Sequence, residues 1–122
     1  MNPIDISNAS DEQLTDAYTR AAFGHGSATR NGDHEAANRH HDAITAIYRE
    51  LRVRGGRAQS ALVPLMQHGD ECVRSWSAAH ALEFAPEQAE PVLTELAAGQ
   101  GFAAFNAKMT LREWRKGRLS FP

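Results

Sequence analysis

Residues 62–96 read LVPLMQHGDECVRSWSAAHALEFAPEQAEPVLTEL, and the pattern within this stretch decides the fold. Its apolar residues recur at intervals of three and four, which is the spacing of an amphipathic helix. Gly69-Asp70 separates two such runs, because Gly ends a helix and the Asp side chain can accept the first free amides of the next one. Pro86 marks a further start, since Pro is tolerated in the first turn of a helix. The stretch therefore predicts short helices joined by tight turns.

An internal sequence similarity within this half of the chain, called the echo below, indicates a repeat. Three correspondences at a constant offset of 30 residues make up the echo: Leu62-Val63 over Val92-Leu93, Met66 over Leu96, and Gly69 over Gly99. Repeats of this period are typical of helical solenoids, in which each hairpin buries its apolar face against its neighbours. The echo predicts stacked helical hairpins.

Residues 62–96 also resemble the HEAT-like repeat of the short, phycobilin-lyase type. The residues that carry the resemblance are Leu62-Val63-Pro64-Leu65, Gly69-Asp70, Val73-Arg74, Ser77-Ala78-Ala79 and Ala81-Leu82. The sequence departs from the commonest pattern of that repeat at Leu82, which follows Val73 by nine residues instead of eight. The resemblance implies an α-α superhelix built from antiparallel hairpins.

Capping and stop signals divide the whole chain into about six helices. Ser10 and Gln13 have the spacing of a capping box, and Asn31-Gly32-Asp33 separates the first helix from the second. The remaining expected helices cover residues 34–54, 58–67, 70–82, 86–98 and 102–116. Pro64 lies inside the second of these and should kink it or delay its start. The last helix carries Phe105, Met109, Leu111 and Trp114. The prediction is an all-α fold of three antiparallel hairpins in one HEAT-like domain, residues 1–122, with residues 1–9 loosely ordered.

A second resemblance extends over most of the chain. Three segments are similar to a small bacterial family of uncharacterised helical domains: Leu14–Tyr18, Ile47–Arg52 and Met109–Gly117. This resemblance implies a helical fold and assigns no activity.

Composition limits the functions that can be considered. The formal net charge is −2, so no strongly basic field is available to hold a nucleic-acid backbone. The single cysteine, Cys72, excludes an intrachain disulfide and a multi-cysteine zinc knuckle, and it fits a reducing compartment. Residues 1–10 are polar and no apolar run is long enough to span a bilayer, so we expect no signal peptide, no membrane partner and a cytoplasmic location.

The histidines provide one candidate binding site. His25 and His40 lie at similar distances on either side of the turn at Gly32, so an antiparallel hairpin would bring them face to face. Such a pair, with Asp33, His34 or Glu35 nearby, has ligand types that suit a divalent metal. The spacing matches no standard zinc motif, and a partly buried or exposed structural role fits the same residues. No cofactor is predicted.

Cys72 is the candidate nucleophile. It falls in the first turn of an expected helix, where the helix dipole lowers a thiol pKa, and His68 and His80 are close in sequence. However, His80 follows it by eight residues on the same helix, which is beyond hydrogen-bond reach. A packing role for Cys72 is the simpler interpretation, and we expect no catalytic set.

The second helix of each expected hairpin should line the inner face of the superhelix. Its large and polar residues, the candidate protein-binding set, are Arg49, Arg74, Trp76, His80, Arg112, Trp114 and Arg115. Trp and Arg are the residue types most enriched at binding hot spots. Burial statistics favour a core position for Trp76, whereas Trp114 lies among basic residues that could stack on it or join it in contacting a partner.

The sequence therefore favours a non-enzymatic protein-binding module. A bacterial adaptor or a toxin-neutralising immunity protein would be a concrete form of it, by analogy with other small acidic helical domains. The alternative is a metal- or small-molecule-binding domain that uses His25 and His40. A homo-oligomer is the third hypothesis, because the ends of a short solenoid invite self-association.

Overall fold

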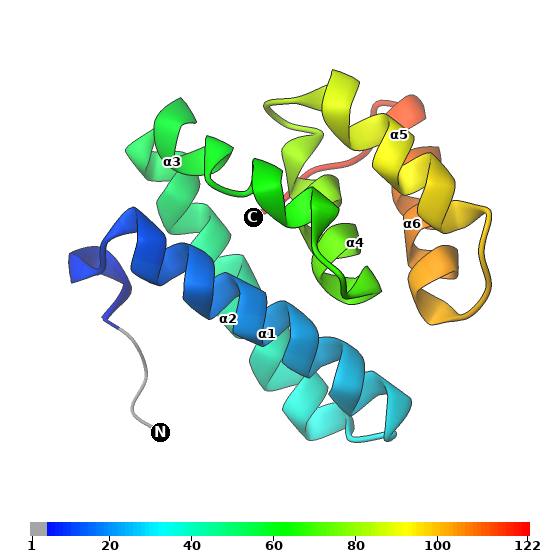
Figure 1. Ribbon diagram of the computed structural model, residues 1–122, viewed down its shortest axis with the longest axis horizontal. Helices are drawn as coiled ribbons and strands as arrows, with labels where there is room; N and C mark the ends of the chain where they lie inside the picture. Colours follow the sequence, from blue (N-terminus) through cyan, green and yellow to red (C-terminus); the bar gives the residue numbers. More distant parts are fainter. Residues whose placement is uncertain (1–4) are drawn as a thin grey trace. The chain divides into compact units, whose positions relative to one another are not determined.

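The computed structural model describes residues 5–122, and within that range the chain is all-α (Figure 1). Two short 3-10 helices accompany the α-helices. The elements are η1 Ile6–Asn8, α1 Asp11–Arg30, α2 His34–Arg54, α3 Gly56–Ser60, η2 Val63–Gln67, α4 Glu71–Ala81, α5 Pro86–Ala97 and α6 Phe102–Arg115. None of the helices in the described range is both long and apolar enough to cross a membrane.

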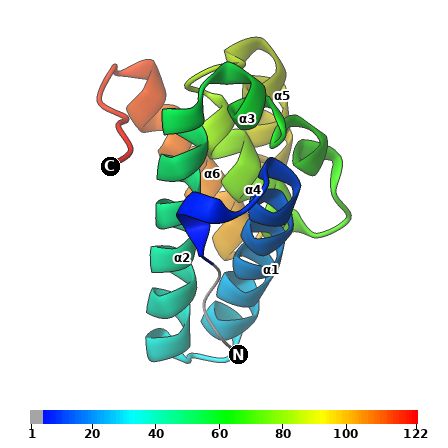
Figure 2. The same cartoon turned by 90° about the vertical axis from the view of Figure 1, so that its left-hand side faces the viewer.

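The chain forms two compact units, and the boundary lies between Ala61 and Leu62. The first unit holds the long antiparallel hairpin of α1 and α2 together with α3, and the second holds η2, α4, α5 and α6 (Figures 1 and 2). Whether residues 1–122 act as one domain stays a prediction.

The α1/α2 hairpin follows the local signals of its sequence. The Ser10 hydroxyl accepts the Gln13 amide at 3.0 Å, and the Gln13 side chain accepts the Ser10 amide at 2.8 Å, which completes the expected capping box. At the turn, Gly32 has a φ of +69° and the Asp33 carboxylate accepts the Ala36 amide at 3.1 Å. Fully buried side chains line the contact between the two helices: Leu14, Tyr18, Ala22, Ile44, Ile47, Tyr48 and Leu51.

The described part of the segment before α1 contacts the C-terminal end of α2. Residues 6–8 form the 3-10 helix η1, and the Arg54 guanidinium donates a hydrogen bond to the Ile6 carbonyl at 3.0 Å. The same guanidinium forms ion pairs with Asp11 and Glu50, each at 2.9 Å. The expectation of loose order for residues 1–9 stays a prediction, and residues 1–4 lie outside the described residues.

The prediction of one helix over residues 58–67 is corrected by the structure, which divides this segment into two elements. α3 ends at Ser60, and the chain resumes only as the five-residue 3-10 helix η2, in which Pro64 lies at an N-terminal position. Proline has no amide hydrogen and disfavours the α conformation in the residue before it, so a continuous helix cannot pass through Val63-Pro64. The middle hairpin thus pairs a 3-10 turn with α4, not two α-helices.

The second unit packs around small side chains. Asp70 caps α4 as expected, since one carboxylate oxygen accepts the Cys72 and Val73 amides at 2.9 and 3.0 Å. α4 contacts η2, α5 and α6. The buried cluster that these elements share consists of Met66, Ala78, Ala81, Leu82, Ala89, Leu93, Ala107 and Leu111. Four of these eight residues are alanine, which allows the helix axes to approach closely.

Replacing Asp70 tests the role of this cap. We expect Asp70→Ala to lower the free energy of unfolding by about 1 kcal/mol, because two amides lose their acceptor. Asp70→Asn should retain most of the stability, since Asn is an equally good cap. Urea unfolding followed by circular dichroism measures both variants, and equal losses for Ala and Asn would contradict the capping role.

Candidate protein-binding surface

α6 has two different faces, and its inner face belongs to the core of the second unit. Ala103, Ala107, Leu111 and Trp114 follow one another at spacings of four, four and three residues, so they share one side of the helix. The first three are buried, and Trp114 packs against the cluster that contains Ala107 and Leu111. This side therefore anchors α6.

The opposite side of α6 carries an exposed aromatic residue among cations. Phe105 is 61% exposed, and the other exposed large apolar side chains of the described residues, Phe23 and Val53, lie in the first unit. Lys108, Arg112 and Lys116 continue along the same side at spacings of three, four and four residues, and all three are exposed. We call Phe105, Lys108, Arg112 and Lys116 the aromatic-basic stripe.

Among the residues predicted to bind a partner, His80 is buried inside the second unit, and Trp76 and Trp114 are partly buried. His80 is only 2% exposed, and its ring centroid lies 4.6 Å from that of Phe121 in an edge-on arrangement and 5.9 Å from that of Trp76. Trp114 is partly buried on the inner side of α6. His80 therefore differs from the exposed position that we expected, because the aromatic contacts of the C-terminal segment and α4 enclose it.

The predicted arginines differ in exposure and in their contacts. Arg49 is exposed on α2, in the first unit, while Arg112 and Arg115 are exposed on α6. Arg115 forms an ion pair with Glu90 of α5 at 3.0 Å. Arg74 is partly buried and donates hydrogen bonds to the carbonyls of His68 and Gly69 at 2.8 and 3.0 Å, so it braces the turn before α4.

The structure also identifies functional candidates that were overlooked in the sequence. The sequence pattern predicts Phe105 in the apolar stripe of the last helix and does not single out Lys108. The signal that could have placed both was the alanine ladder at Ala103 and Ala107, which continues to Leu111 and fixes the buried side of the helix. Phe105 cannot share that side, because it is displaced by two residues from each alanine.

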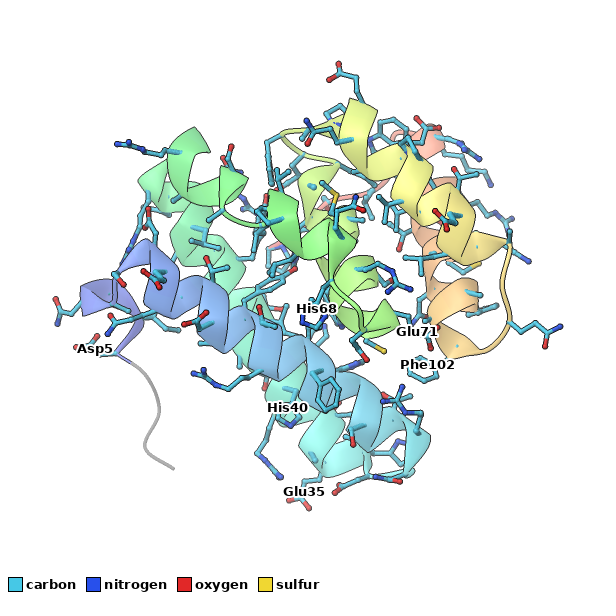
Figure 3. All side chains as sticks on the ribbon, in the orientation of Figure 1. Asp5, Glu35, His40, His68, Glu71 and Phe102 are labelled. Carbon is cyan, nitrogen blue, oxygen red and sulfur yellow. The ribbon has the colours of Figure 1, made fainter. Side chains whose placement is uncertain are left out.

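The second unit contains a cleft of about 470 Å³ next to the turn that Arg74 braces. Met66, Val92 and Leu96 provide apolar walls, and polar residues surround them, including His68 and Glu71 (Figure 3). The volume lies within the range of small-molecule sites. Its charged groups have mixed signs, however, so the cleft selects no particular ligand class.

The histidine hairpin differs in detail from the expected facing pair. The His40 ring lies against Gly24 of α1 so closely that a methyl group at position 24 would come within 2.6 Å of it (Figure 3). The His25 ring instead lies near that of His41, with 6.4 Å between centroids. Gly24 is therefore explained by the close approach of His40.

The metal hypothesis at this hairpin stays a prediction. Within residues 5–122 no group of three or more His, Cys, Asp or Glu side chains is arranged to hold a metal ion. His25 and His41 together would supply two imidazoles.

Cys72, the candidate nucleophile, is buried.

Comparison with known proteins places the chain among helical domains. A family model described as "Domain of unknown function (DUF2019)" matches residues 12–114. The crystal structure of the protein RPA1889 from Rhodopseudomonas palustris CGA009 superposes with a TM-score of 0.89 at 22% sequence identity, over 98% of this chain and 100% of that one. No curated protein matches the sequence. The structural likeness supports the all-α fold.

The environment of His25 predicts how stability depends on pH. Partial burial lowers the pKa of His25, and the nearby His41 and His40 lower it further. The unfolded chain therefore binds a proton at this site more readily than the folded chain, so stability should decrease as the pH falls below the ordinary value of 6.5. In His25→Gln this part of the decrease should disappear. Urea unfolding of both proteins on either side of pH 6.5 measures it, and identical pH dependence would contradict the assignment.

Proposed function

The chain belongs to the DUF2019 family of domains of unknown function, and we propose that it is a non-enzymatic protein-binding module. Its partner contacts the aromatic-basic stripe of α6. The observation that carries this proposal is the 61% exposure of Phe105 beside Lys108 and Arg112. Aromatic residues and arginine dominate the energy of protein interfaces, and here both types lie on one side of α6.

Electrostatics favours a protein over a nucleic acid as the partner. The whole chain has a formal net charge of −2, so its cations are a local feature and not part of a basic field. Nucleic-acid affinity depends on many simultaneous phosphate contacts, whereas a protein interface of modest size needs one aromatic anchor and a few charges. The aromatic-basic stripe has one aromatic residue and three cations, which is the composition of a protein interface.

We further propose that residues 62–122 form HEAT-like hairpins and that the protein acts in the bacterial cytoplasm. The order of η2, α4, α5 and α6 is compatible with two HEAT-like hairpins in residues 62–122, the half that contains the 30-residue echo. A cytoplasmic adaptor or a toxin-neutralising immunity protein of a bacterium would use such a module. The unassigned activity of the family supports neither of these forms over the other.

A photoreactive amino acid at position 105 tests the binding surface. In host cells we expect irradiation to join this position covalently to a protein, because the side chain lies at the centre of the contact. The same residue at position 53 is the control, since Val53 is 77% exposed on α2 outside the stripe. The mass of the adduct shows whether the partner is a second copy or another protein.

The affinity of the captured complex provides the quantitative part of this test. Phe105→Ala should weaken binding roughly 30-fold, which corresponds to the loss of about 2 kcal/mol that is typical of an aromatic hot spot. Val53→Ala should leave the affinity unchanged. Equal adduct yields at positions 105 and 53, or unchanged affinity of Phe105→Ala, would contradict the proposed surface.

A further inference from the structure

The outward side of α5 is acidic, in contrast to that of α6. A shallow surface depression on this helix is lined by Glu87, Glu90, Pro91, Thr94 and Glu95, which we call the acidic stripe. α5 contains no lysine or arginine along its whole length. The three carboxylates are therefore not neutralised by neighbours on their own helix.

The acidic stripe and the aromatic-basic stripe lie next to each other. α5 and α6 are sequential helices joined by a short turn, and they pack against each other along the hairpin (Figure 1). The ion pair between Arg115 and Glu90 spans the boundary between the two stripes at 3.0 Å. One surface of the second unit thus presents a negative band beside a positive band.

We propose that this surface binds a second copy of the chain through a twofold axis that runs parallel to the two stripes. Such an axis places the acidic stripe of one copy over the aromatic-basic stripe of the other, and the reverse pairing follows by symmetry. The inference rests on the proposed function, because it names the partner of the same stripe. A band of a single sign would fit many partners, whereas two adjacent bands of opposite sign are complementary to themselves.

The positions along the hairpin match in this arrangement. Glu87 and Arg112 are equally distant from the turn between α5 and α6, and so are Pro91 and Lys108. The axis keeps each level opposite the same level, so Glu87 of one copy meets Arg112 of the other. Phe105 lies nearer the turn and covers the end of the acidic stripe at Glu95, where its exposed ring loses contact with water.

The dimension of the surface predicts weak association. Helices of 12 and 14 residues are about 20 Å long, and packed helices lie about 10 Å apart. The patch is therefore smaller than the roughly 800 Å² per partner of a standard stable interface. We expect a monomer–dimer equilibrium that depends on concentration and weakens with salt, because the contacts are largely ionic.

Charge reversal on each stripe separately tests the pairing. In Glu87→Lys/Glu95→Lys both stripes are basic, and in Lys108→Glu/Arg112→Glu both are acidic, so each variant alone should sediment as a monomer. An equimolar mixture should form a dimer again, because each stripe then faces one of opposite sign. Sedimentation equilibrium at low salt over a range of concentrations measures all three samples and the unmodified chain.

Matched reversals outside the two stripes are the controls. Asp16→Lys/Asp42→Lys and Arg39→Glu/Arg57→Glu change the net charge by the same amounts at exposed positions of the first unit, and each should dimerise as the unmodified chain does. The inference is overturned if the unmodified chain is monomeric at every concentration and salt, or if the two stripe variants fail to associate with each other. Capture of a different protein at position 105 without any dimer would overturn the self-association alone and leave the proposed function intact.

Discussion

The close packing of alanine side chains between α4, α5 and α6 is the constraint on which the functional surface depends. Ala78, Ala81, Ala89 and Ala107 are completely buried, and their small volume lets the helix backbones approach. Once Ala107 faces this cluster, Leu111 must follow it inward at the next turn of α6. The helix then has no freedom to bury Phe105, which points to the outside together with the basic residues that share its side.

The same constraint separates the charges of the second unit. Ala89 and Leu93 fix the buried side of α5, so its glutamates face outward, and the cations of α6 do likewise. The Arg115–Glu90 ion pair is exposed at its two side chains and contributes little to stability. The ion pair shows instead where the acidic stripe of α5 comes close to the basic side of α6.

Local signals in the sequence were sufficient to place most helix ends. Ser10, Asp33 and Asp70 each cap a helix through hydrogen bonds to amides two or three residues away, and such contacts need no tertiary information. The kink or later start expected at Pro64 corresponds to the division of the third helix, since the loss of the amide hydrogen is a local property. The fold class was correct for these reasons.

The positions of the functional side chains were harder to predict, because they depend on tertiary contacts. His80 is polar and was expected at a surface, but Phe121, far away in the sequence, covers its ring. Trp114 was grouped with Arg112 and Arg115 because they are neighbours in sequence, although adjacent positions on a helix point in different directions. The side of α6 that faces the core, and with it the inward position of Trp114, follows from the burial of Ala103 and Ala107.

α6 buries the side of Trp114 and exposes the side of Phe105, and the proposed binding surface depends on this orientation. The free energy of unfolding of Trp114→Ala and Phe105→Ala, measured with urea in dilute protein at high salt, distinguishes the two sides. We expect a loss of about 2 kcal/mol for Trp114→Ala, because a partly buried ring that packs against the core cluster is removed, and a change within about 0.5 kcal/mol for Phe105→Ala. A large loss for Phe105→Ala with little change for Trp114→Ala would show that the helix is oriented the other way.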